Sequence, residues 1–108
     1  MTIQTLRVLS AMLEEPTGNH YGFDLARKAD IKPGVLYPIL KRLEKDKWAT
    51  SAWEEQTPED IGRPRRRYYT LTPNGIERAR VEVEDHIASF SRSSLGRRQI
   101  PRPSEGTV

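Results

Sequence analysis

The apolar residues of the first half of the chain recur at helical spacing in three consecutive segments, residues 2–15, 20–29 and 34–46. Thr2 is a suitable N-cap for the first segment, and short turns rich in Pro, Gly, Asn or Asp separate the three. Because Pro38 has no amide hydrogen and is tolerated only near a helix start, the third helix is expected to begin close to Gly34 or Val35. The apolar stripes are Ile3, Leu6 and Leu13, then Tyr21, Leu25 and Ala29, then Leu36, Ile39, Leu40 and Leu43.

From Trp48 the pattern changes to a period of two. Residues 48–54 alternate between polar and apolar, and residues 67–72 are rich in aromatic and β-branched side chains, so both segments are predicted to be strands. A polar loop of residues 56–65 joins them into a hairpin. Trp48 and Trp53 are an odd number of positions apart and face opposite sides. One is expected in the core, and the other packs against the hairpin or lines a ligand cavity.

A fourth helix is predicted for residues 73–91, with Thr72 as N-cap and Pro73 at the first helical position. Along it, Ile76, Val83 and Phe90 stand seven residues apart and Ile87 fills an alternate position, which is typical of a two-helix seam. We expect a second copy of the chain to cover this seam, and packing on its own domain is the alternative. Residues 92–108, rich in Pro, Gly, Ser and Arg, are predicted to form a disordered basic tail.

Composition narrows the class of protein. Hydrophobic residues make up 35% and charged residues 31% of the 108, against about 45–50% and about 25% in ordinary soluble domains. The chain is therefore expected to fold only if its apolar residues are well patterned, or if part of its apolar surface is buried against a second copy. There is no cysteine and no apolar stretch long enough for a transmembrane helix, and no signal peptide is readable, so a cytoplasmic location is expected. His20 and His86 lack neighbours that would form a metal site, and no catalytic motif is present. We therefore expect neither an enzyme nor a cofactor.

The net charge of +3 is a mild bias toward polyanions, but its distribution is informative. Residues 27–47 hold seven basic against three acidic side chains, and residues 63–67 hold four arginines and no acid. The order of elements, three helices, a hairpin and a last helix, is that of a winged helix-turn-helix, mainly α with a small β-hairpin. In that fold the third helix enters the DNA major groove and the hairpin extends beside it, which brings the two basic blocks to one face.

Three stretches carry a family resemblance. They are Tyr21-Gly-Phe-Asp-Leu25, Lys32-Pro-Gly-Val-Leu-Tyr-Pro-Ile-Leu-Lys-Arg-Leu-Glu44 and Gly62-Arg-Pro-Arg-Arg-Arg-Tyr-Tyr-Thr-Leu-Thr-Pro-Asn-Gly75. Over roughly residues 3–80 the chain resembles the PadR family of transcriptional regulators, in a form with a short C-terminal part. The resemblance implies that residues 35–44 are the recognition helix, that residues 62–67 are the wing, and that the last helix mediates dimerisation. It also implies a repressor that releases DNA when it binds a small molecule.

The predicted organisation is a DNA-binding domain of residues 1–72, a dimerisation helix of residues 73–91 and a tail of residues 92–108. The predicted partners are double-stranded DNA, a second copy, and a small-molecule effector whose identity the sequence leaves open. A winged-helix protein–protein adaptor and an architectural DNA binder without sequence preference remain as alternatives.

The wing arginines could also pair with Glu54, Glu55, Glu59 or Asp60 of the same hairpin. For DNA contact, Arg63 and Arg65 are favoured over Arg67. The predicted DNA-binding residues are Lys32, Tyr37, Pro38, Lys41, Arg42, Lys45, Arg63, Arg65 and Arg66, and the predicted dimerisation residues are Leu6, Ile76, Val83, Ile87 and Phe90.

Overall fold

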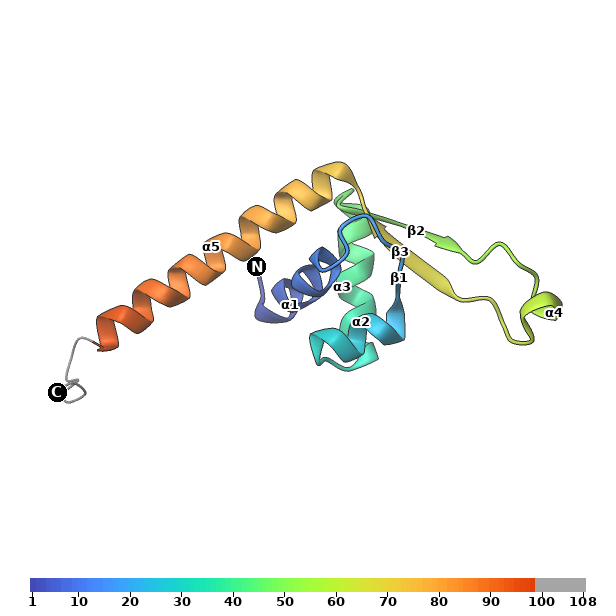
Figure 1. The fold of residues 1–108 in the computed structure, drawn as a ribbon, viewed down its shortest axis with the longest axis horizontal. Helices are drawn as coiled ribbons and strands as arrows, with labels where there is room; N and C mark the ends of the chain where they lie inside the picture. Colours follow the sequence, from blue (N-terminus) through green and yellow to red (C-terminus); the bar gives the residue numbers. More distant parts are fainter. Residues whose placement is uncertain (99–108) are drawn as a thin grey trace.

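The computed structural model describes the backbone of residues 1–98 and the side chains of residues 1–92. Helices α1–α3 form a cluster; the hairpin leaves it on one side and α5 runs out on the other (Figure 1). This arrangement confirms a mainly helical winged-helix fold. No helix in the described residues is long and apolar enough to cross a membrane. The elements are α1 (Ile3–Leu13), β1 (His20–Tyr21), α2 (Gly22–Ala29), α3 (Pro33–Lys45), β2 (Ala49–Trp53), α4 (Pro58–Ile61), β3 (Arg67–Leu71) and α5 (Pro73–Arg98).

The core lies between the first three helices, the sheet and the start of α5. Leu9, Leu36 and Leu40 are fully buried there, and each buried side chain of this size contributes about 1.5–3 kcal/mol. The predicted N-cap is confirmed, because the Thr2 side chain accepts a hydrogen bond from the Thr5 amide at 3.2 Å. The predicted stripe of α3 lies in this core. The stripe predicted for the first helix is wrong at Ile3, which is 47% exposed, because α1 turns Val8, Leu9 and Met12 toward the core instead.

The start of α3 differs from the expectation. The helix begins at Pro33, and Pro38 lies inside it rather than in its first turn. Pro33 occupies a position where its missing amide hydrogen is not needed. The missing amide of Pro38 leaves the Gly34 carbonyl without a helical partner, but both residues are exposed, so solvent can supply that bond.

The sheet has three antiparallel strands in the order β1-β3-β2, one strand more than the predicted hairpin. The added strand replaces the expected first turn of the second helix, because His20 pairs with Tyr69 and Tyr21 with Tyr68. His20 is buried, and its Nε2 lies 2.9 Å from the Glu15 carbonyl oxygen. This local anchoring holds the chain extended up to Gly22, where α2 begins.

The wing loop contains a short helix, α4, where a plain polar loop was expected. Its N-cap Thr57 accepts a hydrogen bond from the Asp60 amide at 3.2 Å. It ends at Gly62, whose φ of 71° is left-handed and is favourable only for glycine. The tip of the wing is therefore shaped by its own caps.

Helix α5 is held at its start against the beginning of β2. The Gly75 amide donates to Thr72 Oγ1 at 2.9 Å, and that hydroxyl donates to the Lys47 carbonyl at 2.8 Å. The helix continues to Arg98, so the predicted end at Ser91 is wrong for residues 92–98. No proline occurs between Ser91 and position 98, so nothing in the backbone interrupts the helical hydrogen bonds. The remainder of the predicted tail, residues 99–108, lies outside the described residues.

Candidate nucleic-acid interface

Helix α3 has one buried and one exposed face. Leu36, Leu40 and Leu43 are buried, which fixes the helix on α1 and α2 and turns its other face outward. All the predicted DNA-binding residues of this segment are exposed, as are the two residues that follow Pro33: Lys32, Gly34, Val35, Tyr37, Pro38, Lys41, Arg42 and Lys45.

The positive charges of the lysines on this face are not offset by a nearby carboxylate of the described residues. Among the described residues, Lys32, Lys41 and Lys45 belong to no ion pair. Arg42 lies 3.9 Å from Asp46, and an exposed pair of this kind contributes about 0–1 kcal/mol. The lysines are therefore available to bind a polyanion, and Arg42 is held only weakly by Asp46.

Tyr37 joins the two helices of the helix-turn-helix. Its side chain is 42% exposed, as expected for a surface residue. Its hydroxyl end, however, lies against Gly22: a Cβ on that glycine would overlap Tyr37 Oη and lie 2.8 Å from Cζ. The ring thus lies at the surface while its polar end faces the start of α2.

The wing arginines are held by Glu54. Arg63 donates to both carboxylate oxygens of Glu54, at 2.7 and 3.0 Å, and the backbone amide of Arg66 donates to Oε1 at 2.9 Å. These hydrogen bonds, first from the Arg63 side chain and then from the Arg66 amide, lower the pKa of Glu54 to about 2. Arg65 instead donates from Nε to the Gln56 carbonyl at 3.0 Å. The alternative of pairing within the hairpin is confirmed for Glu54, while the side chains of all three arginines stay exposed at one edge.

A second network ties the wing to the recognition helix. Arg67 donates to Ser51 Oγ at 3.0 Å from Nε and at 2.7 Å from Nη2. Ser51 in turn donates to Glu44 Oε2 at 2.6 Å. These residues stand on β3, β2 and α3, so the network sets the angle between the hairpin and α3. Nothing in the sequence pairs them, because residues 44, 51 and 67 meet only through the fold.

A hollow of about 410 Å³ lies where the wing meets the two helices. The Arg66 guanidinium carbon is 4.2 Å from the centre of the Tyr21 ring, and that of Arg67 is 5.3 Å from the centre of the Trp53 ring. Residues of α2, α3 and the wing line the hollow, so the three elements adjoin there: Tyr21, Gly22, Phe23, Asp24, Tyr37, Trp53, Arg66, Arg67 and Tyr69.

The two tryptophans divide as expected. Trp48 is half-buried and packs against the core, with the Arg78 guanidinium carbon 5.9 Å from its ring centre. Trp53 is 54% exposed and packs with Arg67 of the wing. Trp53 therefore lies on the side of the molecule that carries the wing, rather than in the core.

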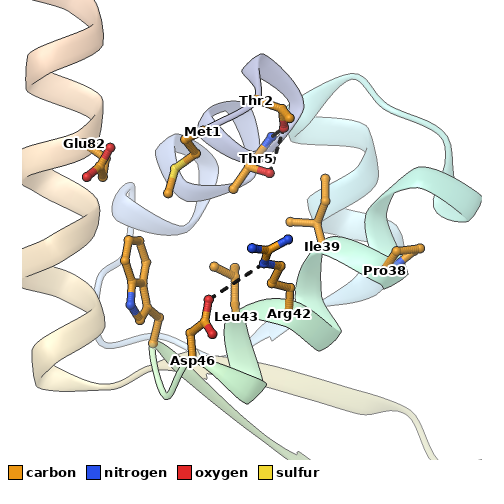
Figure 2. A pocket seen from close by; sticks show the side chains of 10 residues that line it. Met1, Thr2, Thr5, Pro38, Ile39, Arg42, Leu43, Asp46 and Glu82 are labelled. Atoms are coloured by element: carbon orange, nitrogen blue, oxygen red, sulfur yellow. Dashed lines mark hydrogen bonds and ion pairs between the residues drawn. The ribbon is translucent and has the colours of Figure 1, made fainter.

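A larger pocket, of about 580 Å³, lies on the other flank of α3 (Figure 2). Met1, Thr2 and Thr5 at the start of α1 face Pro38, Ile39 and Arg42 of α3 across it, with Glu82 of α5 at the side (Figure 2). Trp48 also lines it. The pocket is thus formed where the DNA-binding domain meets α5.

The predicted dimerisation residues fall into two groups. Leu6 is buried, and Ile76 and Val83 are half-buried and pack against the core of their own chain. Ile87 and Phe90 are 57% and 63% exposed, because α5 has by then passed the end of the domain (Figure 1). The first half of the stripe is used within one chain, and the second half is left uncovered.

Within the described residues, no group of His, Cys, Asp and Glu could hold a metal ion. The buried His20 is a structural residue that anchors β1 through the Glu15 carbonyl.

A family model for the PadR-like transcriptional regulators matches residues 8–81, which run from the middle of α1 to the first turns of α5. This chain belongs to the PadR-like family of transcriptional regulators. It is therefore a DNA-binding, non-enzymatic regulator, as the sequence motifs implied. No curated protein matches the chain.

Among solved structures, a PadR family transcriptional regulator from Eggerthella lenta is 26% identical, covers 82% of this chain and 80% of its own, and has a TM-score of 0.60. ZitR from Lactococcus lactis is 16% identical, and the two structures agree with a TM-score of 0.68. The match covers 94% of this chain and 63% of ZitR. BpsR from Bordetella bronchiseptica, whose DNA binding is regulated by 6-hydroxynicotinic acid, is 20% identical with a TM-score of 0.65, covering 97% of this chain and 70% of its own. The last two show the fold alone.

Proposed function

We propose that this PadR-like protein is a sequence-specific repressor that binds an inverted-repeat operator as a homodimer. The observation that carries the proposal is the outer face of α3, where Lys41 and Lys45 are exposed beside an arginine-bearing wing and form no ion pair with any described residue. Tyr37 of α3 and Arg66 of the wing line one hollow, so the two basic blocks adjoin. Such a regulator would act in the cytoplasm, which remains a prediction.

Phosphate contacts would supply most of the affinity. Each lysine or arginine that neutralises a phosphate releases counterions, so binding weakens steeply with salt. The proposed contacts are Lys32 at the N-cap of α3, Lys41 and Lys45 on α3, and Arg63, Arg65 and Arg66 on the wing. The wing arginines are already positioned by Glu54 and Gln56, so binding would require little further ordering of Arg63 and Arg65.

The uncovered end of α5 supports the homodimer. Phe90 and Ile87 continue the stripe of Ile76 and Val83, yet no residue in the described part of the chain covers them. A second copy would bury this apolar surface. In a symmetric dimer of this class two recognition helices stand about 34 Å apart, which matches half-sites one helical turn apart.

Release of DNA by a small molecule is also part of the proposal. The pocket between α1, α3 and α5 supports it, because a ligand there would touch both Arg42 of the recognition helix and Glu82 of the proposed dimer helix. Regulation of BpsR by a small aromatic acid shows that such control occurs on this fold. The test is a screen of small aromatic acids for a rise in melting temperature that coincides with loss of operator binding. If every ligand that stabilises the protein leaves operator binding unchanged, effector-mediated release is rejected.

The decisive experiment is selection from a pool of random duplexes by the purified full chain, with selected and unselected DNA compared at low and at about 0.15 M salt. Enrichment of an inverted repeat bound well above background would support the proposal and supply the operator. Salt-sensitive binding without selection would establish the architectural alternative. No binding at either salt would establish the adaptor.

A further inference from the structure

The exposed face of α3 changes chemistry along its length. Its first two turns present Gly34, Val35 and Pro38, none of which carries a side-chain hydrogen-bonding group, and Lys41 and Lys45 follow. At 1.5 Å of rise per residue, the apolar end and the basic end are about 10 Å apart. The exposed face of α3 thus begins with an apolar tip, Gly34, Val35 and Pro38, which is followed by a basic part, Lys41 and Lys45.

The polar side chains nearest this tip point elsewhere or lie outside it. Lys32 is the N-cap residue and precedes the first helical turn. The hydroxyl of Tyr37 lies against Gly22 at the start of α2. Val35, Pro38 and the helix backbone at Gly34 therefore offer a groove floor carbon surface, next to the exposed Tyr37 ring.

Gly34 is a glycine that the fold does not require. A Cβ there would meet nothing within 4 Å, and its φ is not in the left-handed region. Glycine within a helix costs roughly 0.5–1 kcal/mol relative to alanine, and close approach of the backbone to a ligand is one of its uses. An open glycine on the exposed face of α3 fits such an approach.

In helix-turn-helix proteins, the N-terminal residues of the recognition helix meet the base edges. In the major groove, the one base-edge feature that an apolar surface recognises is the C5-methyl group of thymine. We infer that Val35 and Pro38, with the backbone at Gly34, read thymine methyl groups in each half-site of the operator. This inference rests on the proposed function and adds the chemistry by which the operator is read.

The test replaces single thymines of the selected operator by deoxyuridine, which removes the methyl group and leaves base pairing unchanged. At one or two positions in each half-site, affinity should fall about fourfold, equivalent to roughly 0.8 kcal/mol for one methyl-sized group. The same replacement outside the half-sites should have no effect. An operator without thymine in its half-sites, or one in which no replacement changes affinity, overturns the inference.

A variant of Val35 and a matched control test whether this residue reads the thymine methyl group. With Val35→Ala, the ratio of affinities for thymine and deoxyuridine should fall toward one at the position that Val35 contacts. Val81→Ala is the matched control, because that valine is exposed to a similar degree, 45% against 41%, but stands on α5. If Val35→Ala leaves this ratio unchanged at every position, Val35 does not contact a thymine methyl group.

Gly34→Ala separates fold from recognition. The melting temperature should hold or rise, because alanine is the better helix residue and no neighbour is displaced. Operator affinity should fall about tenfold, equivalent to roughly 1.4 kcal/mol, because the added methyl group would stand between the helix backbone and the base edge. Unchanged affinity overturns the close approach at Gly34. Failure to select any operator rejects the proposed function itself, whereas a selected operator insensitive to deoxyuridine rejects the methyl reading alone.

Discussion

Tyr37 is fitted against Gly22, so the exposed side of the recognition helix and the first residue of α2 have complementary shapes. Gly22→Ala would place a methyl group where the Tyr37 hydroxyl lies. We expect it to lower the free energy of unfolding by about 1 kcal/mol, the low end of the cost of overpacking, because the 42% exposed Tyr37 side chain can shift its hydroxyl end. Chemical denaturation measures this. Gly34→Ala is the matched control, since its added Cβ meets nothing within 4 Å. Equal stability of the two variants would show that Tyr37 moves aside freely.

Lys41 is exposed on the outer face of α3 and pairs with no acidic side chain of residues 1–92, and we propose that it contacts a DNA phosphate. Lys41→Ala should weaken binding and flatten the slope of log affinity against log salt by about one unit, the value of one lost phosphate contact. Lys28→Ala is the control, because Lys28 stands on α2 with its ammonium 3.8 Å from the Glu14 carboxylate. Titrations at several salt concentrations give both slopes. If both variants keep the slope of the parent protein, Lys41 makes no phosphate contact.

Phe90 is 63% exposed near the far end of the described side chains of α5. Phe90→Asp should convert a dimer into monomers without unfolding the domain, because the side chain lies outside the core cluster. Light scattering gives the mass and circular dichroism the helix content. Ser89→Asp adds the same charge one residue away, off the apolar stripe, and should leave the mass unchanged. If the Phe90→Asp protein keeps the mass of a dimer, the proposed dimer contact through this stripe of α5 is wrong.

Glu54 links acid stability to the wing. Its pKa is lowered to about 2 by hydrogen bonds from Arg63 and the Arg66 amide. Because the folded pKa is below the unfolded value of 4.5, this contribution to stability is present above pH 4.5 and is lost as pH falls toward about 2. An NMR titration of the Glu54 carboxyl carbon should show a midpoint near 2, with the Arg63 guanidinium signals changing in step. A midpoint at the ordinary value would mean that the wing opens in solution.

Local patterns predicted much of this molecule. Helical spacing located the cores of α1, α2 and α3, and Thr72 with Pro73 marked the start of α5. These elements depend on which face of a helix is apolar and on how the backbone begins a turn, and both are properties of neighbouring residues. The basic residues of α3 and the wing were found in the same way, from their types and their order along the chain.

Other features required partners distant in the sequence. The strand His20–Tyr21 is too short to show a period of its own and exists because β3 lies beside it. The seven-residue spacing of α5 showed a single stripe, but only the position of α1 decided that Val83 packs within the chain while Phe90 is left uncovered.

The sequence by itself determined the family, the order of the four main helices and the hairpin, and the residue types that DNA would meet, because these follow from local periodicity and motif. Only the tertiary structure decided how the wing arginines are held, which end of α5 is free, and that Tyr37 turns its hydroxyl toward Gly22. Each of these depends on distances between residues far apart in the chain, and such distances are set by the packing of the whole core rather than by any one segment.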